Sequence, residues 1–259
     1  MIRTLQNIWS VTYRNALMYS KTWKLNILPN FFEPVFYLLG LGLGLGFYVQ
    51  EIAGVPYSVF LAPGLIVIAA MNGASFEATY NVYVRMNYNR TYDAIIATPV
   101  SESEIVWGEI LWAIIRSLIY GGAFYIITVA FGLIPSRFSI GALPIILLTG
   151  YLFAVMGMAF AMTIPTIDLF SIYFTLFLTP LTIFSDTFFP LAERLPANLF
   201  WIPEITPLFH CVRLARAFTS GNFAPILWWD AAYILGLALF FHWFSLRQFT
   251  RRIHKPSAR

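Results

Sequence analysis

Six long apolar stretches divide this chain, and they decide what it can fold into. Each is roughly 20 residues or more, the length that an α-helix needs to cross a hydrocarbon core about 30 Å thick. Membrane-spanning helices are therefore predicted over residues 27–49, 57–80, 106–132, 140–164, 169–189 and 224–246. We expect an all-α integral membrane protein with one transmembrane domain over residues 1–259.

Composition supports this class and excludes others. Of the 259 residues, 59% are hydrophobic and 11% are charged, and the mean hydropathy is +0.72, so lipid must solvate most of the surface. The net charge of +4 rests on 16 lysine and arginine residues, too few for a basic face that binds nucleic acid. The single cysteine, Cys211, excludes an internal disulfide.

Residues 1–24 have the pattern of a helix with two unlike sides. Leu5, Trp9 and Tyr13 share an apolar side, whereas Arg14 belongs to a polar one. The segment lacks the continuous apolar core and cleavage pattern of a removable signal. We expect an amphipathic helix that lies along the membrane interface, with packing against protein as the alternative.

Lysine and arginine residues are unequally divided between the two sides of the predicted spans. Eleven face the cytoplasm if the N-terminus does, four face outward, and Arg116 lies inside the third span. This bias and the even number of spans predict that both termini are cytoplasmic. An unpaired arginine at the bilayer centre costs about 2.5–3.5 kcal/mol on insertion scales. We therefore expect Arg116 to pair with Glu33, Glu77 or Glu109, with a substrate contact as the alternative.

The polar segment between the second and third spans, residues 88–100, contains a predicted short helix. Pro99 should end this helix. Ser101 and Glu104 form a capping-box pattern for the helix that follows. The segment is either a rigid lever at the cytoplasmic surface or an ordinary, well-capped loop.

Residues 190–220, between the fifth and sixth spans, are broken by prolines into short pieces. Thr206 followed by Pro207 is typical of a helix start. Arg213 and Arg216 recur at three-residue spacing on this helix, and we predict that they meet an anionic head group. Arginines that extend to the outer interface are the alternative.

Aromatic residues make up 18% of the chain, and many lie within the predicted spans. Their rings could stack on sugars or contact acyl chains, although lipid-facing bulk explains most of them. The candidate substrate pathway consists of Phe36, Tyr37, Phe174, Phe177, His210, Arg213 and Arg216.

Two segments resemble motifs of a known family. Residues 90–100, with Tyr92 and Asp93, and residues 105–110, with Trp107, resemble the motif of type-two ABC transporter permeases. Residues 180–213 resemble the outer-loop motif of the same family, except that Asp186 stands where a small residue, often glycine, is usual. The chain is similar to the nodulation-factor exporter branch at residues 76–78, 85–86, 90–91 and 105–109 and at Trp112.

The resemblance implies a permease subunit of the bacterial inner membrane that forms a homodimer and binds two ABC ATPase subunits. ATP and Mg would bind to those partners, and this chain would bind no cofactor or metal and would not be an enzyme. Consistent with this expectation, the sequence contains no G-x-x-x-x-G-K-[ST] phosphate loop. The resemblance also implies a coupling helix within residues 88–100 and two short re-entrant helices within residues 190–220. The implied coupling residues are Tyr92, Asp93, Ile95, Ile96 and Thr98.

The resemblance further implies export of an amphipathic cargo such as a lipo-oligosaccharide or glycolipid. Efflux of hydrophobic drugs or antibiotics is the main alternative. A proton-coupled secondary transporter is a further one, although no acidic residue is placed convincingly at the midplane and no inverted repeat of broken helices is visible.

Overall fold

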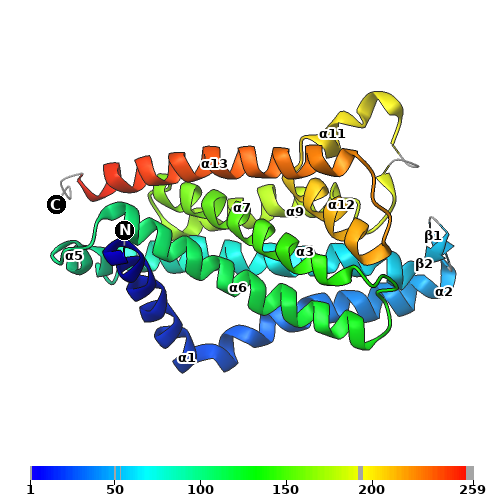
Figure 1. Ribbon diagram of the computed structural model, residues 1–259, viewed down its shortest axis with the longest axis horizontal. Coiled ribbons are helices and arrows are strands. Elements are labelled where there is room, and N and C mark those ends of the chain that lie inside the picture. The colour runs from blue at the N-terminus through cyan, green and yellow to red at the C-terminus, as the bar shows by residue number, and fades with distance from the viewer. Residues whose placement is uncertain (1, 50, 53, 192–194, 255–259) are drawn as a thin grey trace.

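The computed structural model describes residues 2–49, 51–52, 54–191 and 195–254. Its helices run mainly along the long axis of the molecule (Figure 1). One end carries the N-terminus, the short helix α5 (Thr91–Ile96) and the end of α13 (Ile226–Ile253). The other end carries a hairpin of β1 (Glu51–Ile52) and β2 (Val55–Pro56), in which Glu51 pairs with Pro56. We call these the α5 end and the hairpin end.

The first helix joins two elements that the sequence predicted as separate. α1 (Ile2–Leu39) covers the predicted interfacial helix and much of the first predicted span, and it bends sharply between its two halves (Figure 1). The two predicted elements are therefore parts of one continuous, bent helix. A π-helical turn, η1 (Gly40–Leu45), and α2 (Gly46–Tyr48) follow. The alternating glycines of η1 have low helix propensity, which suits an irregular turn.

The second long segment also contains a π-helical turn. It consists of α3 (Tyr57–Phe76), η2 (Glu77–Asn81) and α4 (Val82–Asn87) in succession. The third, α6 (Glu102–Ala130), begins at a capping box in which Ser101 accepts from the Glu104 N–H and Glu104 accepts from the Ser101 N–H. This confirms the predicted helix start, which depends on neighbouring residues only.

The remaining elements follow α6 in the chain and complete the bundle. Their order is η3 (Ser139–Gly141), α7 (Ala142–Thr163), η4 (Ile167–Leu169), α8 (Phe170–Ile172), η5 (Tyr173–Leu178), α9 (Thr179–Ile183), η6 (Ala197–Leu199), α11 (Trp201–Glu204), α12 (Pro207–Ser220) and α13. Thr206 is the N-cap residue of α12 and Pro207 its first residue, which confirms the predicted start. Both α11 and α12 fall within residues 190–220, and their re-entry into a membrane stays a prediction.

α3 lies at the centre of the bundle, where α6 and α7 pack against it. Glycines permit this close packing. A Cβ atom on Gly73 of α3 would lie 2.5 Å from the Tyr120 ring and 3.1 Å from the Arg116 carbonyl oxygen of α6. A Cβ atom on Gly121 of α6 would lie 2.9 Å from the Ala70 side chain. The two helices therefore meet nearly backbone to backbone.

Four helical segments are long and apolar enough to cross a membrane. They are Tyr57–Asn87, Glu102–Ala130, Ser139–Thr163 and Ile226–Ile253. They correspond to the second, third, fourth and sixth predicted spans. The first and fifth correspond to shorter apolar helices, Val35–Tyr48 and Ile167–Ile183. The chain is thus a mostly helical, multi-pass protein, and the count of six spans stays a prediction.

Candidate functional site

The predicted coupling segment forms a distinct short helix, α5, at the α5 end. Arg90 precedes it in a left-handed conformation, with a φ of 48°, which turns the chain sharply out of α4. Tyr92 is buried and its ring contacts Phe249 of α13 edge to face, with 5.3 Å between centroids. Burial raises the pKa of the Tyr92 hydroxyl well above its usual value, so the group stays neutral.

The other predicted coupling residues differ in exposure. Asp93 and Thr98 are exposed, whereas Ile95 and Ile96 are half-buried and pack against the core. Of the five residues, Tyr92 is therefore buried against α13 and does not contribute to the exposed surface of the segment. Asp93 and Thr98 are available for contact with another protein.

Residues of α1 and α13 hold the start of α6, which follows α5, on two sides. Asn7 of α1 donates to the Glu104 carboxylate, at 2.9 Å, and to the Pro99 carbonyl oxygen, at 3.3 Å. On the other side, Glu102 accepts from the Thr250 hydroxyl of α13, at 2.5 Å, and lies 2.7 Å from His254. With the Tyr92–Phe249 contact and the Asn7–Pro99 bond, residues 91–104 are thus attached to α1 and α13 and do not form a free loop.

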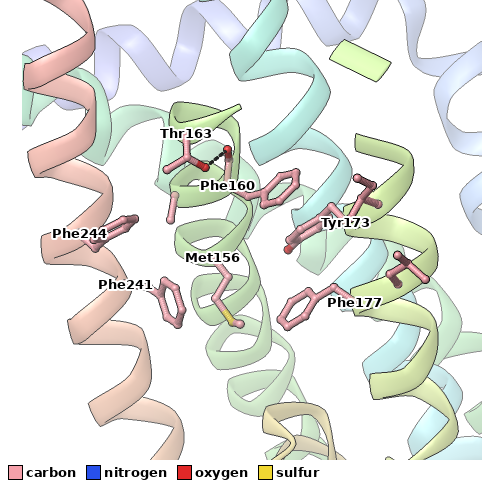
Figure 2. Close-up of a pocket in the computed structure, with 10 residues that line it drawn as sticks. Met156, Phe160, Thr163, Tyr173, Phe177, Phe241 and Phe244 are labelled. Carbon is pink, nitrogen blue, oxygen red and sulfur yellow. Dashed lines mark hydrogen bonds between the residues drawn. The ribbon is translucent and has the colours of Figure 1, made fainter. Parts of the chain in front are cut away.

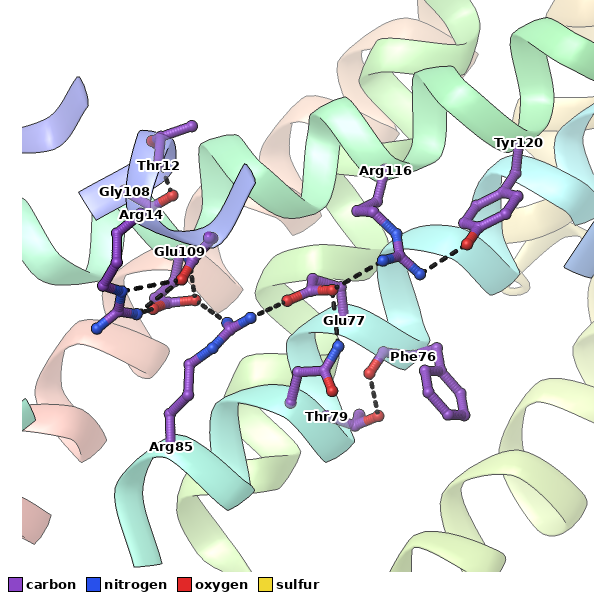
Figure 3. Close-up of polar contacts among 12 residues, drawn as sticks. Thr12, Arg14, Phe76, Glu77, Thr79, Arg85, Gly108, Glu109, Arg116 and Tyr120 are labelled. Atoms are coloured by element: carbon purple, nitrogen blue, oxygen red, sulfur yellow. Dashed lines mark hydrogen bonds and ion pairs between the residues drawn. The ribbon is translucent and has the colours of Figure 1, made fainter. Parts of the chain in front are cut away.

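A network of buried charges joins the helices on either side of α5 in the chain to α1 and η2 (Figure 3). Arg85 of α4 donates to Glu109 of α6, at 2.5 Å, and to Glu77 of η2, at 2.6 Å. Arg14 of α1 also donates to Glu109, at 3.1 Å. Both carboxylates are essentially inaccessible to solvent. Buried charges remain tolerable only when they are paired and hydrogen-bonded, as these are.

Arg116 pairs with Glu77, which confirms the predicted ion pair for the arginine in the third span. Its Nη1 atom lies 3.5 Å from the Glu77 carboxylate, and its Nη2 atom donates to the Tyr120 hydroxyl, at 2.7 Å (Figure 3). The guanidinium also lies over the Tyr19 ring, 4.1 Å from the centroid. Glu109 pairs with other arginines, and the Glu33 side chain lies outside the described residues.

A second polar cluster lies in the hairpin-end half and includes two predicted pathway residues. His210 is buried, with its Nδ1 atom 2.6 Å from Asp230 of α13. Arg213 donates to the same Asp230 and to Glu204 of α11. Burial lowers the pKa of Arg213, but the two carboxylates outweigh it and raise the pKa overall. The charge of Arg213 is therefore compensated within the chain, which favours a structural role.

Arg216 is paired as well. It donates to the Asp186 carboxylate and to the Asp186 carbonyl oxygen, and its guanidinium lies 4.2 Å from the centre of the Phe60 ring. Asp186 adopts a left-handed φ of 63° and accepts from the Leu191 N–H, at 2.7 Å. This backbone explains why glycine suits the position, and aspartate can adopt it because its side chain is bonded locally.

The four aromatic pathway residues fall into two separate groups. Phe36 and Tyr37 are exposed on α1, and the Tyr37 ring lies 6.0 Å from Phe188. Phe174 and Phe177 lie on η5, where Phe174 stacks on Tyr80 at 5.7 Å. Among the described residues, no ring contact joins the two groups. The structure therefore does not bring the predicted pathway residues together.

Several residues of these sites were missed from the sequence. Arg14, Arg85 and Asp230 take part in buried ion pairs. Arg14 belongs to the predicted interfacial helix and Arg85 follows the second predicted span, so only Asp230 lies inside a predicted span, where a charge needs a partner. Asp230 in particular lies in the first turns of the last predicted span, and a buried carboxylate there indicates a nearby cation. The π-helical turn η5 had no sequence signal.

Long apolar helices, buried ion pairs between them and a short helix attached to one end define a multi-pass helical membrane protein. A family model described as ABC-2 type transporter matches residues 6–219. Nodulation protein J of Rhizobium leguminosarum bv. viciae is 37% identical over 216 residues, which are 83% of this chain and 83% of that protein. The same-named protein of Rhizobium meliloti (strain 1021) is 34% identical over 213 residues, 82% of this chain and 81% of that protein.

A more distant relative covers slightly more of the chain. Inner membrane transport permease YadH of Escherichia coli (strain K12) is 23% identical over 230 residues, 86% of each chain. The protein described here belongs to the ABC-2 type transporter family. It is a membrane permease subunit, and such subunits lack an ATPase domain and typically bind no cofactor. Membership implies ATPase subunits as partners.

Proposed function

We propose that this chain is the transmembrane subunit of an ATP-driven exporter in the bacterial inner membrane. Its cargo is an amphipathic molecule such as a lipo-oligosaccharide or glycolipid. Two copies of the chain pair, and two ABC ATPase subunits dock at the α5 ends on the cytoplasmic side, where both termini lie. The ATPase subunits bind ATP and Mg.

The observation that carries this proposal is the attachment of α5. Asp93 of α5 and Thr98 just after it are exposed, whereas Tyr92 is packed against α13. Asn7 of α1 donates to the Pro99 carbonyl oxygen just after α5, and Arg85 joins the preceding helix to α6. A displacement imposed on α5 by an ATPase would therefore be passed to α1, α6 and α13 together. An unattached loop would absorb such a displacement.

The cargo follows from the resemblance to nodulation-factor exporters, supported by the names of the nodulation relatives. A molecule with a glycan head and an acyl chain presents polar and apolar parts at once. The exposed rings of Phe36 and Tyr37 could contact either part.

The test is a transport assay in proteoliposomes that contain this chain and its partner ABC ATPase. Asp93→Arg should lower ATP-driven export of a fluorescent lipo-oligosaccharide at least tenfold without loss of inserted protein. Glu51→Arg, which makes the same change of charge at an exposed residue of the hairpin end, should leave export unchanged.

Other outcomes separate the competing functions. Wild-type export in Asp93→Arg, together with normal ATPase binding, would remove α5 as the docking site. Faster transport of a hydrophobic antibiotic than of the glycolipid would indicate drug efflux. Transport that an ionophore abolishes while ATP is intact would indicate a proton-coupled carrier.

A further inference from the structure

A cavity of about 440 Å³ lies between α7, η5 and α13 (Figure 2). We call it the α7–α13 groove. Five aromatic rings surround it, and the Met156 side chain extends between Phe177 and Phe241 (Figure 2). Its volume lies within the range of about 300–1,000 Å³ that is typical of ligand sites. The other three of the five rings belong to Phe160, Tyr173 and Phe244.

The groove opens sideways from the helix bundle. Leu176 and Ile172 on its rim are 69% and 45% exposed. Both α7 and α13 belong to segments long and apolar enough to span a membrane, so a sideways opening between them faces lipid. The π-helical turn η5 supplies Tyr173, Leu176 and Phe177 to the wall, and such turns are frequent at functional sites.

The lining has almost no polar group with which to orient a polar ligand. Thr163 and Tyr173 carry its hydroxyls, and the Thr163 hydroxyl already donates to the Phe160 carbonyl oxygen, at 2.8 Å. Ligand sites for drug-sized molecules usually add a few convergent polar groups to an apolar wall. A wall of rings and aliphatic side chains suits a flexible hydrocarbon chain instead.

The groove continues toward a positively charged surface at the α5 end. Phe241, Phe244, Gln248 and Arg251 share one face of α13 by their spacing of three and four residues. Arg251 is exposed and lies seven positions after Phe244, which corresponds to a rise of about 10 Å along the helix axis. This separation puts a cation beyond the end of the apolar groove, where a lipid head group would lie.

Two further arginines add to this charge. Arg252 donates to the Ala161 carbonyl oxygen near the end of α7, at 2.8 Å, and Arg247 is exposed one turn before Arg251. Two carboxylates could offset these arginines. Asp168 belongs to η4, the segment that faces this end of α13, and Glu102 of α6 is already paired with His254. Positive charge therefore predominates around the groove's end among the described residues.

We propose that the α7–α13 groove binds one acyl chain of an anionic phospholipid from the bilayer half at the α5 end, with its phosphate at Arg251. The occupant is a resident lipid and not the cargo, so the proposal is independent of the transport function. Apolar burial holds the acyl chain and the arginine selects the head group.

The test uses the purified chain in nanodiscs, without an ATPase. The probe is phosphatidylglycerol with a diazirine near the end of one acyl chain, compared with the matching phosphatidylcholine. After irradiation, mass spectrometry should find at least fivefold more label from phosphatidylglycerol on η5 and on residues 241–244. A tenfold excess of unlabelled phosphatidylglycerol should remove most of this label.

Substitutions test which residues are responsible for the labelling by the lipid probe. Leu176→Trp fills the rim and should lower labelling at least fivefold, whereas Ile126→Trp, on an exposed part of α6, should not change it. Arg251→Gln should reduce the preference for phosphatidylglycerol to less than twofold while labelling by phosphatidylcholine stays constant. Uniform labelling of all lipid-facing helices, equal labelling by both lipids, or displacement of the probe by a lipo-oligosaccharide but not by phosphatidylglycerol would each overturn the proposal. Cross-links from the groove to a second copy of the chain would do the same.

Discussion

Arg85 donates to Glu109 across 2.5 Å, and these two residues lie on either side of α5 in the chain. Arg85 belongs to the helix that enters α5 and Glu109 to the helix that leaves it. The ion pair therefore joins the two helices that flank α5, the segment at which we propose that the ATPase docks. Because Arg85 also binds Glu77 of η2, the same ion-pair network reaches the centre of the bundle.

Arg85→Gln should strongly destabilise the protein. The substitution leaves two buried carboxylates with less positive charge, and breaking a buried ion pair typically costs about 3–5 kcal/mol. We expect a marked fall in the melting temperature of the purified protein, followed by circular dichroism in mild detergent. Arg247→Gln, which removes an exposed arginine, is the control and should change little. Equal melting temperatures for the two variants would show that the buried network contributes nothing to stability.

The substitutions Tyr92→Ala and Tyr92→Phe test whether the ring or the hydroxyl group of this residue is needed at α5. Loss of a large buried ring costs about 3–5 kcal/mol, and here it removes the contact with Phe249. We expect faster trypsin cleavage after Arg90 and loss of ATP-driven export. Tyr92→Phe keeps the ring and should behave as wild type in both assays. The packing role is wrong if the phenylalanine variant is as impaired as the alanine variant.

Gly108→Ala should push the N-terminal half of α1 away from α6. A Cβ atom at Gly108 would lie 2.6 Å from the Val11 Cβ atom and 3.0 Å from the Ile8 carbonyl oxygen. Overpacking of this kind typically costs about 1–3 kcal/mol, and we expect increased tryptic cleavage after Arg14. Gly122→Ala is a matched control on the same helix, because its added Cβ would meet only Leu118, at 3.7 Å. Equal cleavage in the two variants would contradict the close contact.

Asp186→Ala should be less stable than Asp186→Gly. Both variants lose the ion pair with Arg216, but alanine must also hold the left-handed φ of 63°, which costs about 1–2 kcal/mol for an ordinary residue. We expect the glycine variant to melt at the higher temperature. The opposite order would mean that the turn relaxes when the ion pair is removed.

Local sequence signals predicted helix boundaries well. The capping box of Ser101 and Glu104 and the helix start at Thr206 depend only on residues within one turn. The exposed apolar side of the N-terminal helix, with Leu5, Trp9 and Tyr13, also follows from helical spacing. The bend that joins this helix to the next has no comparable local pattern.

The functional residues were harder to predict because their roles depend on which helices meet. Arg213 and Arg216 looked available for a substrate, yet each is paired with a carboxylate from another element. Tyr92 looked like part of a docking surface, yet it faces α13. Three candidate partners for Arg116 could be named, and packing of α6 against η2 selected Glu77.

The amino-acid sequence alone determined the class of this protein, because hydropathy over 20-residue stretches decides whether a helix is stable in lipid or in water. It also determined the family, because the motifs are contiguous. Only the tertiary structure decided which buried charges are paired, which side of α5 is exposed and where the α7–α13 groove opens. These properties arise from contacts between residues far apart in the chain, whose energies no local pattern contains.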